Sequence, residues 1–82
     1  MTTRATVNGM FNVLEGLKKP DFIFVEVLLN VGGTYDLCVV NHANKREVLH
    51  VLWGNCPSKD KEYLEALALI GNEYAWELMH HA

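Results

Sequence analysis

The sequence predicts a single small α+β domain in which a helix, a three-stranded antiparallel β-meander and a second helix follow one another. Apolar residues recur at helical spacing before residue 18 and again after residue 58. Between these segments, residues 21–54 hold three runs of β-prone residues. The turn sequences Gly32-Gly33 and Ala43-Asn44-Lys45 separate the runs, and consecutive strands joined by short turns usually pair antiparallel.

Length and composition limit the classes of protein to consider. With 82 residues the chain makes one domain, and we expect residues 1–5 to form a flexible N-terminus. Half of the residues are hydrophobic, which suffices for a core and argues against disorder. The net charge of −3 is opposite in sign to that of proteins that grip phosphate backbones. Because no apolar run approaches a membrane span and no secretory signal pattern is present, we expect a cytoplasmic protein.

The first helix is expected to start after Thr6, whose hydroxyl can accept a hydrogen bond from a free amide of the first turn. Lys18 and Lys19 suit the negative end of the helix dipole, and Pro20 prevents the helix from continuing. The stripe expected to face the core consists of Val7, Met10, Phe11, Leu14 and Leu17.

Residues 22–31 make the strongest predicted strand, and residues 34–41 and 47–53 make the next two. Gly32 and Gly33 supply the positive φ angles that a tight hairpin needs, and residues 54–57 are expected to end the third strand. One side of the first strand is entirely apolar, so it should meet the core. Those side chains are Ile23, Val25, Val27, Leu29 and Val31.

The last helix is expected to start after Ser58, an N-cap residue, and to run from Lys59 to about His80. A break at Gly71-Asn72 into two shorter helices is the alternative, because glycine ends helices and asparagine starts them. The expected apolar stripe consists of Tyr63, Leu64, Leu67, Ile70, Tyr74 and Leu78.

No pattern in the sequence indicates catalysis, a metal or a cofactor. Cys38, His42, His50 and Cys56 have metal-binding side chains, but their spacing matches no zinc-finger pattern. We expect the two cysteines to be free thiols in a reducing compartment, with one disulfide as the alternative. Nucleophilic catalysis by a cysteine would need a positioned base and a concave substrate site, so we expect no enzymatic activity.

The order of elements resembles that of the double-stranded-RNA-binding domain, in which a Gly-rich turn and lysines precede the last helix. The segment Gly54 to Lys61 is similar to that site, and the resemblance implies Lys59 and Lys61 as phosphate contacts. Asp60 and Glu62 interrupt these lysines, and the turn at Gly32-Gly33 lacks the histidine that the family places there. RNA binding is therefore the alternative, and nucleic acid is not the expected partner.

Two helical elements can cover one face of a three-stranded sheet, which would leave apolar side chains exposed on the other face. Helices on opposite faces would instead bury both. An exposed apolar patch usually marks an association site, and the acidic last helix adds a negative field that suits a basic partner. The predicted interaction residues are Phe22, Phe24, Glu26, Leu28, Glu65, Glu73 and Glu77.

These features favour a non-enzymatic protein that binds other proteins. In one version it self-associates as a homodimer or larger homo-oligomer through the side of the sheet that carries Phe22 and Phe24. In the other, a sheet edge and the acidic helix occupy a basic or apolar site on a larger protein or nucleoprotein assembly. In size, charge and class the chain resembles phage-encoded inhibitors of host machinery, including anti-CRISPR proteins. That resemblance implies an inhibitor or regulator acting in the host cytoplasm.

Overall fold

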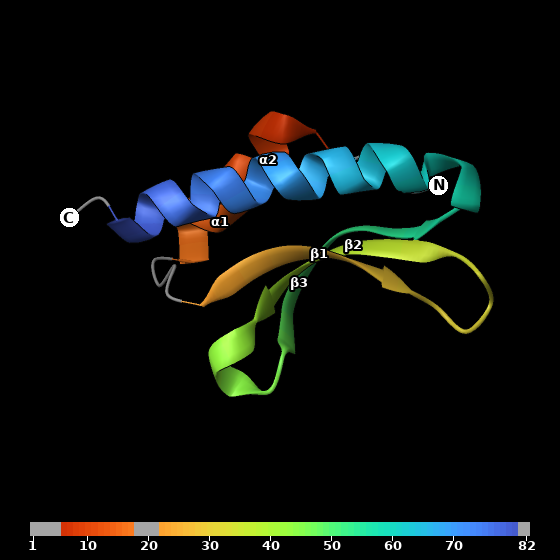
Figure 1. Cartoon of the computed structure of the whole chain (residues 1–82), viewed down its shortest axis with the longest axis horizontal. Coiled ribbons are helices and arrows are strands. Elements are labelled where there is room, and N and C mark those ends of the chain that lie inside the picture. The colour runs from red at the N-terminus through yellow and green to blue at the C-terminus, as the bar shows by residue number, and fades with distance from the viewer. Residues whose placement is uncertain (1–5, 18–21, 81–82) are drawn as a thin grey trace.

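The computed structural model describes residues 6–17 and 22–80 and has the predicted α+β architecture (Figure 1). Its elements are α1 (Val7–Leu17), β1 (Ile23–Leu29), β2 (Tyr35–Asn41), β3 (Glu47–Cys56) and α2 (Lys61–His80). Two short 3-10 turns, His42–Asn44 and Ser58–Asp60, flank β3. The strands form one antiparallel sheet in the order β1-β2-β3. The predictions for residues 1–5, Lys18, Lys19 and Pro20 concern residues outside the described part of the chain.

Both helices lie on the same face of the sheet (Figure 1), so the alternative with one helix on each face is wrong. The core forms between this face and the helices. From the sheet it takes Val25, Leu37 and Val39, which are almost fully buried, and from the helices it takes Met10 and Leu64. The opposite face, which we call the outer face, has no helix over it in the described residues.

The first helix begins as predicted. The hydroxyl oxygen of Thr6 accepts a hydrogen bond from the Gly9 amide at 3.0 Å. The Phe11 ring stacks on Tyr74 of α2 with ring centroids 4.0 Å apart, and the Tyr74 hydroxyl donates a hydrogen bond to Glu15. These contacts fasten α1 to the middle of α2.

The first hairpin curves away from the helices (Figure 1). Ile23 and Val25 are buried as expected, but Leu29 is 66% exposed and Val31 is fully exposed. They lie on the predicted core row, yet this end of the strand curves away from α2 (Figure 1). Of the two turn glycines only Gly33 has a positive φ, of 89°, and its amide donates to the carbonyl of Asn30 at 2.9 Å. The expectation of positive φ at both glycines is wrong for Gly32.

The third strand continues to Cys56, three residues past its predicted end at Trp53. Irregular pairing with β2 accommodates the additional residues. Asn55 takes a left-handed φ of 57°, and its amide donates to the Asp36 carboxylate at 2.8 Å. Because Ser58–Asp60 form a 3-10 turn, α2 starts at Lys61 and not at Lys59.

The last helix is continuous through Gly71 and Asn72, so the alternative with a break there is wrong. Gly71 is buried where α2 crosses α1 and β1. A Cβ atom at this position would lie 2.7 Å from Met10 Sδ and 2.8 Å from Val25 Cγ2. The glycine therefore permits close packing and does not end the helix.

Asn72 closes part of the free edge of β1. Its side-chain oxygen accepts from the Val25 amide at 2.7 Å, and its side-chain nitrogen donates to the Val25 carbonyl at 3.0 Å. The carboxamide thus makes the two bonds that a neighbouring strand would make. An added strand could pair with β1 at Val25 only by displacing this side chain.

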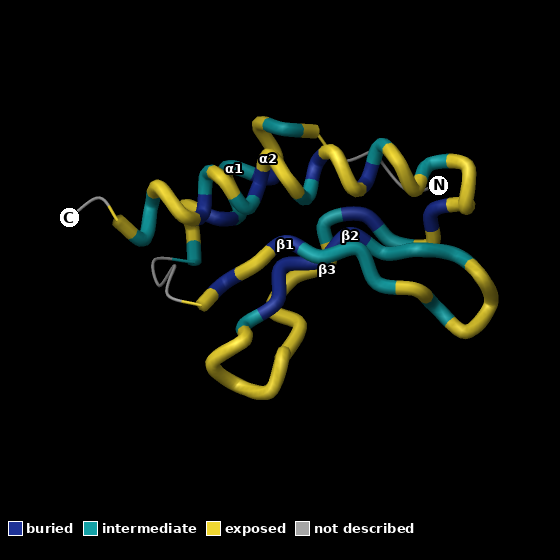
Figure 2. Tube along the Cα trace, viewed as in Figure 1, coloured by how far each residue is buried: buried dark blue, intermediate teal, exposed yellow. Residues whose placement is uncertain are grey.

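The buried side of α2 differs from the predicted stripe at Ile70, Gly71 and Ala75. Leu64, Leu67, Gly71 and Ala75 are buried, whereas Ile70 is 39% exposed. Figure 2 shows the buried positions of the helices on the side toward the sheet, and the exposed turn between β2 and β3 away from them. Within residues 6–17 and 22–80, neither helix combines the length and the apolar character needed to span a membrane.

Candidate functional site

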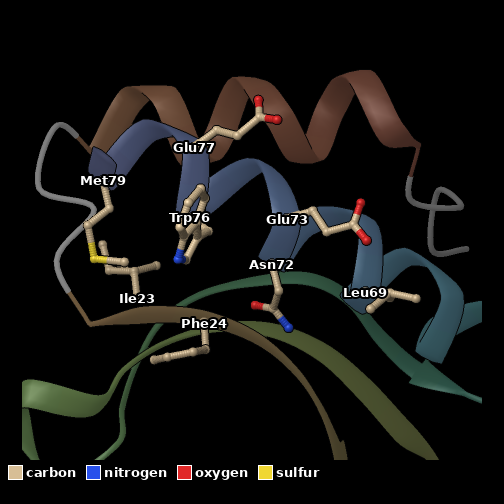
Figure 3. A pocket seen from close by; sticks show the side chains of 8 residues that line it. All are labelled: Ile23, Phe24, Leu69, Asn72, Glu73, Trp76, Glu77 and Met79. Carbon is tan, nitrogen blue, oxygen red and sulfur yellow. The ribbon is translucent and has the colours of Figure 1, made fainter. Parts of the chain in front are cut away.

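A groove of about 500 Å³ lies between the C-terminal half of α2 and the start of β1 (Figure 3). We call it the Trp76 groove. Its volume falls within the ~300–1,000 Å³ of typical ligand sites. Most of its lining is apolar. The residues that line it are Ile23, Phe24, Leu69, Asn72, Glu73, Trp76, Glu77 and Met79.

Trp76 is the largest side chain in this groove. It points from α2 toward β1 (Figure 3), yet it is 58% exposed. The His80 imidazole stacks on the indole with ring centroids 4.0 Å apart, and His80 Nδ1 lies 2.8 Å from the Trp76 carbonyl oxygen. His80 therefore restricts the indole, so a ligand would meet a side chain that has already lost part of its rotational freedom.

The wall formed by β1 is apolar. Ile23 is buried and faces the helix, whereas Phe24 points to the other side of the strand and is 40% exposed (Figure 3). Asn72 presents the main polar group of the floor, and both ends of its carboxamide bond the Val25 backbone. The hydrogen bonds of Asn72 thus fix the floor of the groove to the edge strand of the sheet.

Two acidic residues of α2, Glu73 and Glu77, line the groove and form its rim, and their carboxylates point away from β1 (Figure 3). They lie four residues apart on one helix, a spacing at which like charges repel. No lysine or arginine is among the residues that line the groove. A cation brought by a ligand would relieve this repulsion.

The outer face of the sheet meets the groove at Phe24. The Phe24 ring lies against the His42 imidazole, with centroids 4.6 Å apart. His42 and Arg46 both bond the carboxylate of Glu26, one at each oxygen. Partial burial raises the pKa of Glu26, but the bonds from His42 and Arg46 outweigh it, so the pKa lies below its usual value of 4.5.

Replacing Glu26 by glutamine is expected to flatten the acid side of the stability profile. A carboxyl whose pKa is lowered on folding stabilises the fold above its unfolded pKa, and this stabilisation is lost as pH falls through the folded pKa. Urea unfolding measured from about pH 6 down to about pH 3 should therefore show a smaller loss of unfolding free energy for Glu26→Gln than for the natural chain. Equal losses would show that the contacts of Glu26 do not stabilise its ionised form.

The predicted interaction residues lie in several places. Phe24, Glu73 and Glu77 come together at the Trp76 groove. Phe22 is 60% exposed just before β1. Leu28 is half-buried on the strand opposite Asp36, outside the groove.

Glu26 and Glu65 both line a shallower hollow beside the groove. Glu65 also lies 3.8 Å from Lys61 Nζ, an ion pair between two exposed side chains. Lys61 in addition lies 5.9 Å from the centre of the Tyr35 ring, and Lys59 is exposed in the preceding turn. The charge of Lys61 is thus partly neutralised within the chain.

The cysteines and histidines do not assemble into a site. Cys38 and Cys56 are buried free thiols. Burial, and after it the charges of Asp36 and Glu26, raise the pKa of Cys38 to about 11. Burial likewise raises the pKa of Cys56. Among residues 6–17 and 22–80, no three His, Cys, Asp or Glu side chains are grouped so as to hold a metal ion.

Sequence reasoning missed the residues that shape the groove, above all Leu69, Asn72, Trp76 and Met79. They recur at intervals of three and four residues and so share a side of α2 next to the buried one. The one feature of the sequence that could have indicated the groove was Trp76, a tryptophan outside the predicted core stripe. Its meaning depends on where α2 crosses β1, which the sequence pattern does not specify.

No protein-family model matches the chain, and no curated protein or solved structure shows significant similarity to it.

Proposed function

We propose that this chain is a non-enzymatic protein that binds a partner protein through the Trp76 groove. The partner offers an apolar side chain, which enters the groove, and lysine or arginine residues beside it, which meet the rim. The observation that carries the proposal is an exposed tryptophan over an apolar groove with two carboxylates at its edge.

The apolar lining supports an anchor side chain. Exposed aromatic residues next to a hollow are typical of the few positions that dominate binding energy at protein interfaces, and tryptophan is enriched among them. Trp76 and Leu69 are 58% and 63% exposed, so each has apolar area left to bury against a partner. Burial contributes about 25 cal/mol per Å² before the costs of association are subtracted.

The rim supports a basic partner. Glu73 and Glu77 belong to the part of α2 that lines the groove, and Glu65 lies nearer the N-terminal end of the same helix. Charges arranged in this way speed the encounter with a partner of opposite sign and disfavour acidic partners. The chain's overall charge of −3 acts in the same direction.

The chemistry of the groove favours binding over catalysis. Its lining contains no cysteine, histidine, serine or lysine that could act as nucleophile or base. The amide of Asn72 is engaged with the backbone of β1. The remaining polar groups are the two rim carboxylates, which attract a cation.

The finer form of the proposal is that the chain inhibits or regulates a larger protein or nucleoprotein assembly by occupying one of its basic sites. Its size, its negative charge and its acidic helix support this form. Phage-encoded inhibitors such as anti-CRISPR proteins provide the model for such a role.

A titration with two synthetic peptides tests the proposal. One peptide carries a leucine between arginines, and its counterpart carries glutamates in place of the arginines. In proton–nitrogen correlation spectra the indole N–H of Trp76 should move on addition of the arginine peptide, while the indole of the buried Trp53 stays in place. The glutamate peptide should move neither. A Trp76 signal that responds to neither peptide, or to both alike, would reject the proposed partner chemistry.

A further inference from the structure

The turn between β2 and β3 is the chemical counterpart of the Trp76 groove. Residues 42–49 include His42, Lys45 and Arg46 and one carboxylate, Glu47, whose Oε1 accepts a hydrogen bond from Asn44 Nδ2 at 3.3 Å. Val48 and Leu49 follow at once and are 46% and 37% exposed. We call residues 42–49 the basic turn. It offers cations and apolar side chains together, the combination that the groove is built to receive.

The basic turn lies on the outer side of the sheet, across β1 from the groove (Figure 1), and Phe24 connects the two. The His42 ring packs on Phe24, which itself lines the groove. The His42 amide also donates to the Phe22 carbonyl at 2.8 Å, which ties the turn to the start of β1. An acidic apolar hollow and a basic apolar projection therefore lie on either side of β1 and are connected through Phe24.

The charges of the two surfaces are not matched within one copy. Arg46 bonds Glu26 and does not reach Glu73 or Glu77. Among the described residues, no carboxylate forms an ion pair with Lys45. Lys45 and the rim carboxylates thus remain available to another molecule.

We propose that a second copy of the chain is a ligand of this surface, and that the two copies form a two-fold dimer in which each basic turn enters the other's Trp76 groove. A patch that carries both a surface and its complement is satisfied when it meets itself about a two-fold axis. Lys45 then faces Glu73 and Glu77 of the other copy, and Val48 and Leu49 cover Trp76. The arrangement closes on itself, so it stops at two copies.

This inference concerns the same groove as the proposed function, but it requires no external partner. If both hold, the dimer and the complex with a partner exclude each other. The partner then has to compete with self-association, so its apparent affinity falls as the concentration of the chain rises.

Sedimentation equilibrium over about 1 µM to about 1 mM tests the dimer, a range that spans binding free energies from about −8 to −4 kcal/mol. The natural chain should show a monomer–dimer equilibrium with no larger species, and the dimer should weaken when salt is raised, because salt screens exposed charges. Lys45→Glu and Glu73→Lys should each weaken the homodimer by about tenfold or more, since each variant opposes like charges at both contacts. Lys59→Glu changes an exposed lysine outside both surfaces and should leave the dimer unchanged.

The decisive sample is an equimolar mixture of Lys45→Glu and Glu73→Lys. In the mixed dimer both contacts again join opposite charges, so a heterodimer should form although each variant alone is mainly monomeric. Circular dichroism of each variant checks that it is folded. A natural chain that stays monomeric at about 1 mM, a dimer indifferent to both substitutions, or a mixture without a heterodimer overturns the proposal.

Sedimentation and the peptide titration together distinguish the homodimer from the proposed binding of a partner protein. A strictly monomeric chain whose Trp76 signal still responds to the arginine peptide rejects the dimer and leaves the proposed function in place. A dimer with the expected charge dependence, in a chain whose Trp76 signal does not respond to the arginine peptide, supports the dimer and rejects the proposed function.

Discussion

Replacing Gly71 by alanine should destabilise the fold by about 1–2 kcal/mol, although alanine favours a helix over glycine by ~1 kcal/mol. The added methyl group would lie 2.7 Å from Met10 Sδ and 2.8 Å from Val25 Cγ2. Met10 can adjust its flexible chain, but Val25 is β-branched and fixed in the strand, so α2 has to move away from β1. In thermal unfolding the midpoint should fall by about 5–15 °C, the shift expected for a domain of this size.

The matched control is Gly16→Ala in α1. An added Cβ meets nothing within 4 Å at this exposed position. Only the gain in helix propensity remains, so this variant should be more stable than the natural chain by up to about 1 kcal/mol. Opposite signs for the same substitution in the two helices are the expected result. A stabilising Gly71→Ala would show that α2 does not pack against β1 at the described distance.

Replacing Trp76 by alanine should weaken binding of the arginine peptide by about 10- to 100-fold, equivalent to about 1.4–2.7 kcal/mol. The substitution removes the largest apolar surface of the groove and leaves its carboxylates in place. Because the side chain is 58% exposed, the unfolding free energy should change far less than for a core tryptophan. Isothermal titration calorimetry on the variant measures the loss directly.

Ile70→Ala is the control for this prediction. Ile70 lies on the same helix, is 39% exposed and does not line the groove. Its removal should leave the affinity within about twofold of the natural value, an energy difference below 0.5 kcal/mol. Equal losses of affinity in Ile70→Ala and Trp76→Ala would place the peptide elsewhere on α2. An unchanged affinity in Trp76→Ala would show that the groove does not bind the peptide.

Local patterns predicted the elements of this fold well, because each depends on neighbours in the sequence. Thr6 caps α1 as expected, and the alternating residues of β1 place Ile23 and Val25 in the core. The errors arise where tertiary contacts decide. Gly71 resembles a helix end but serves a close helix crossing, and Asn72 resembles a helix start but bonds the edge of a strand.

The candidate site was only partly predictable for the same reason. Glu73, Glu77 and Phe24 were recognisable as surface residues from charge and from the strand pattern. Their meeting at one groove depends on both helices covering the same face, with α2 placed along the edge of β1. Trp76 can be assigned to a binding groove only once that placement is known, since an exposed tryptophan on a helix is otherwise compatible with many roles.

Selection from a random-peptide display library on the natural chain and, in parallel, on Trp76→Ala tests whether the Trp76 groove binds basic segments with an apolar anchor. Peptides enriched on the natural chain should carry an aromatic or aliphatic residue flanked by lysine or arginine, and this enrichment should disappear on the variant. Peptides without basic residues, or the same peptides recovered equally on both chains, would rule out the proposed binding mode of the Trp76 groove.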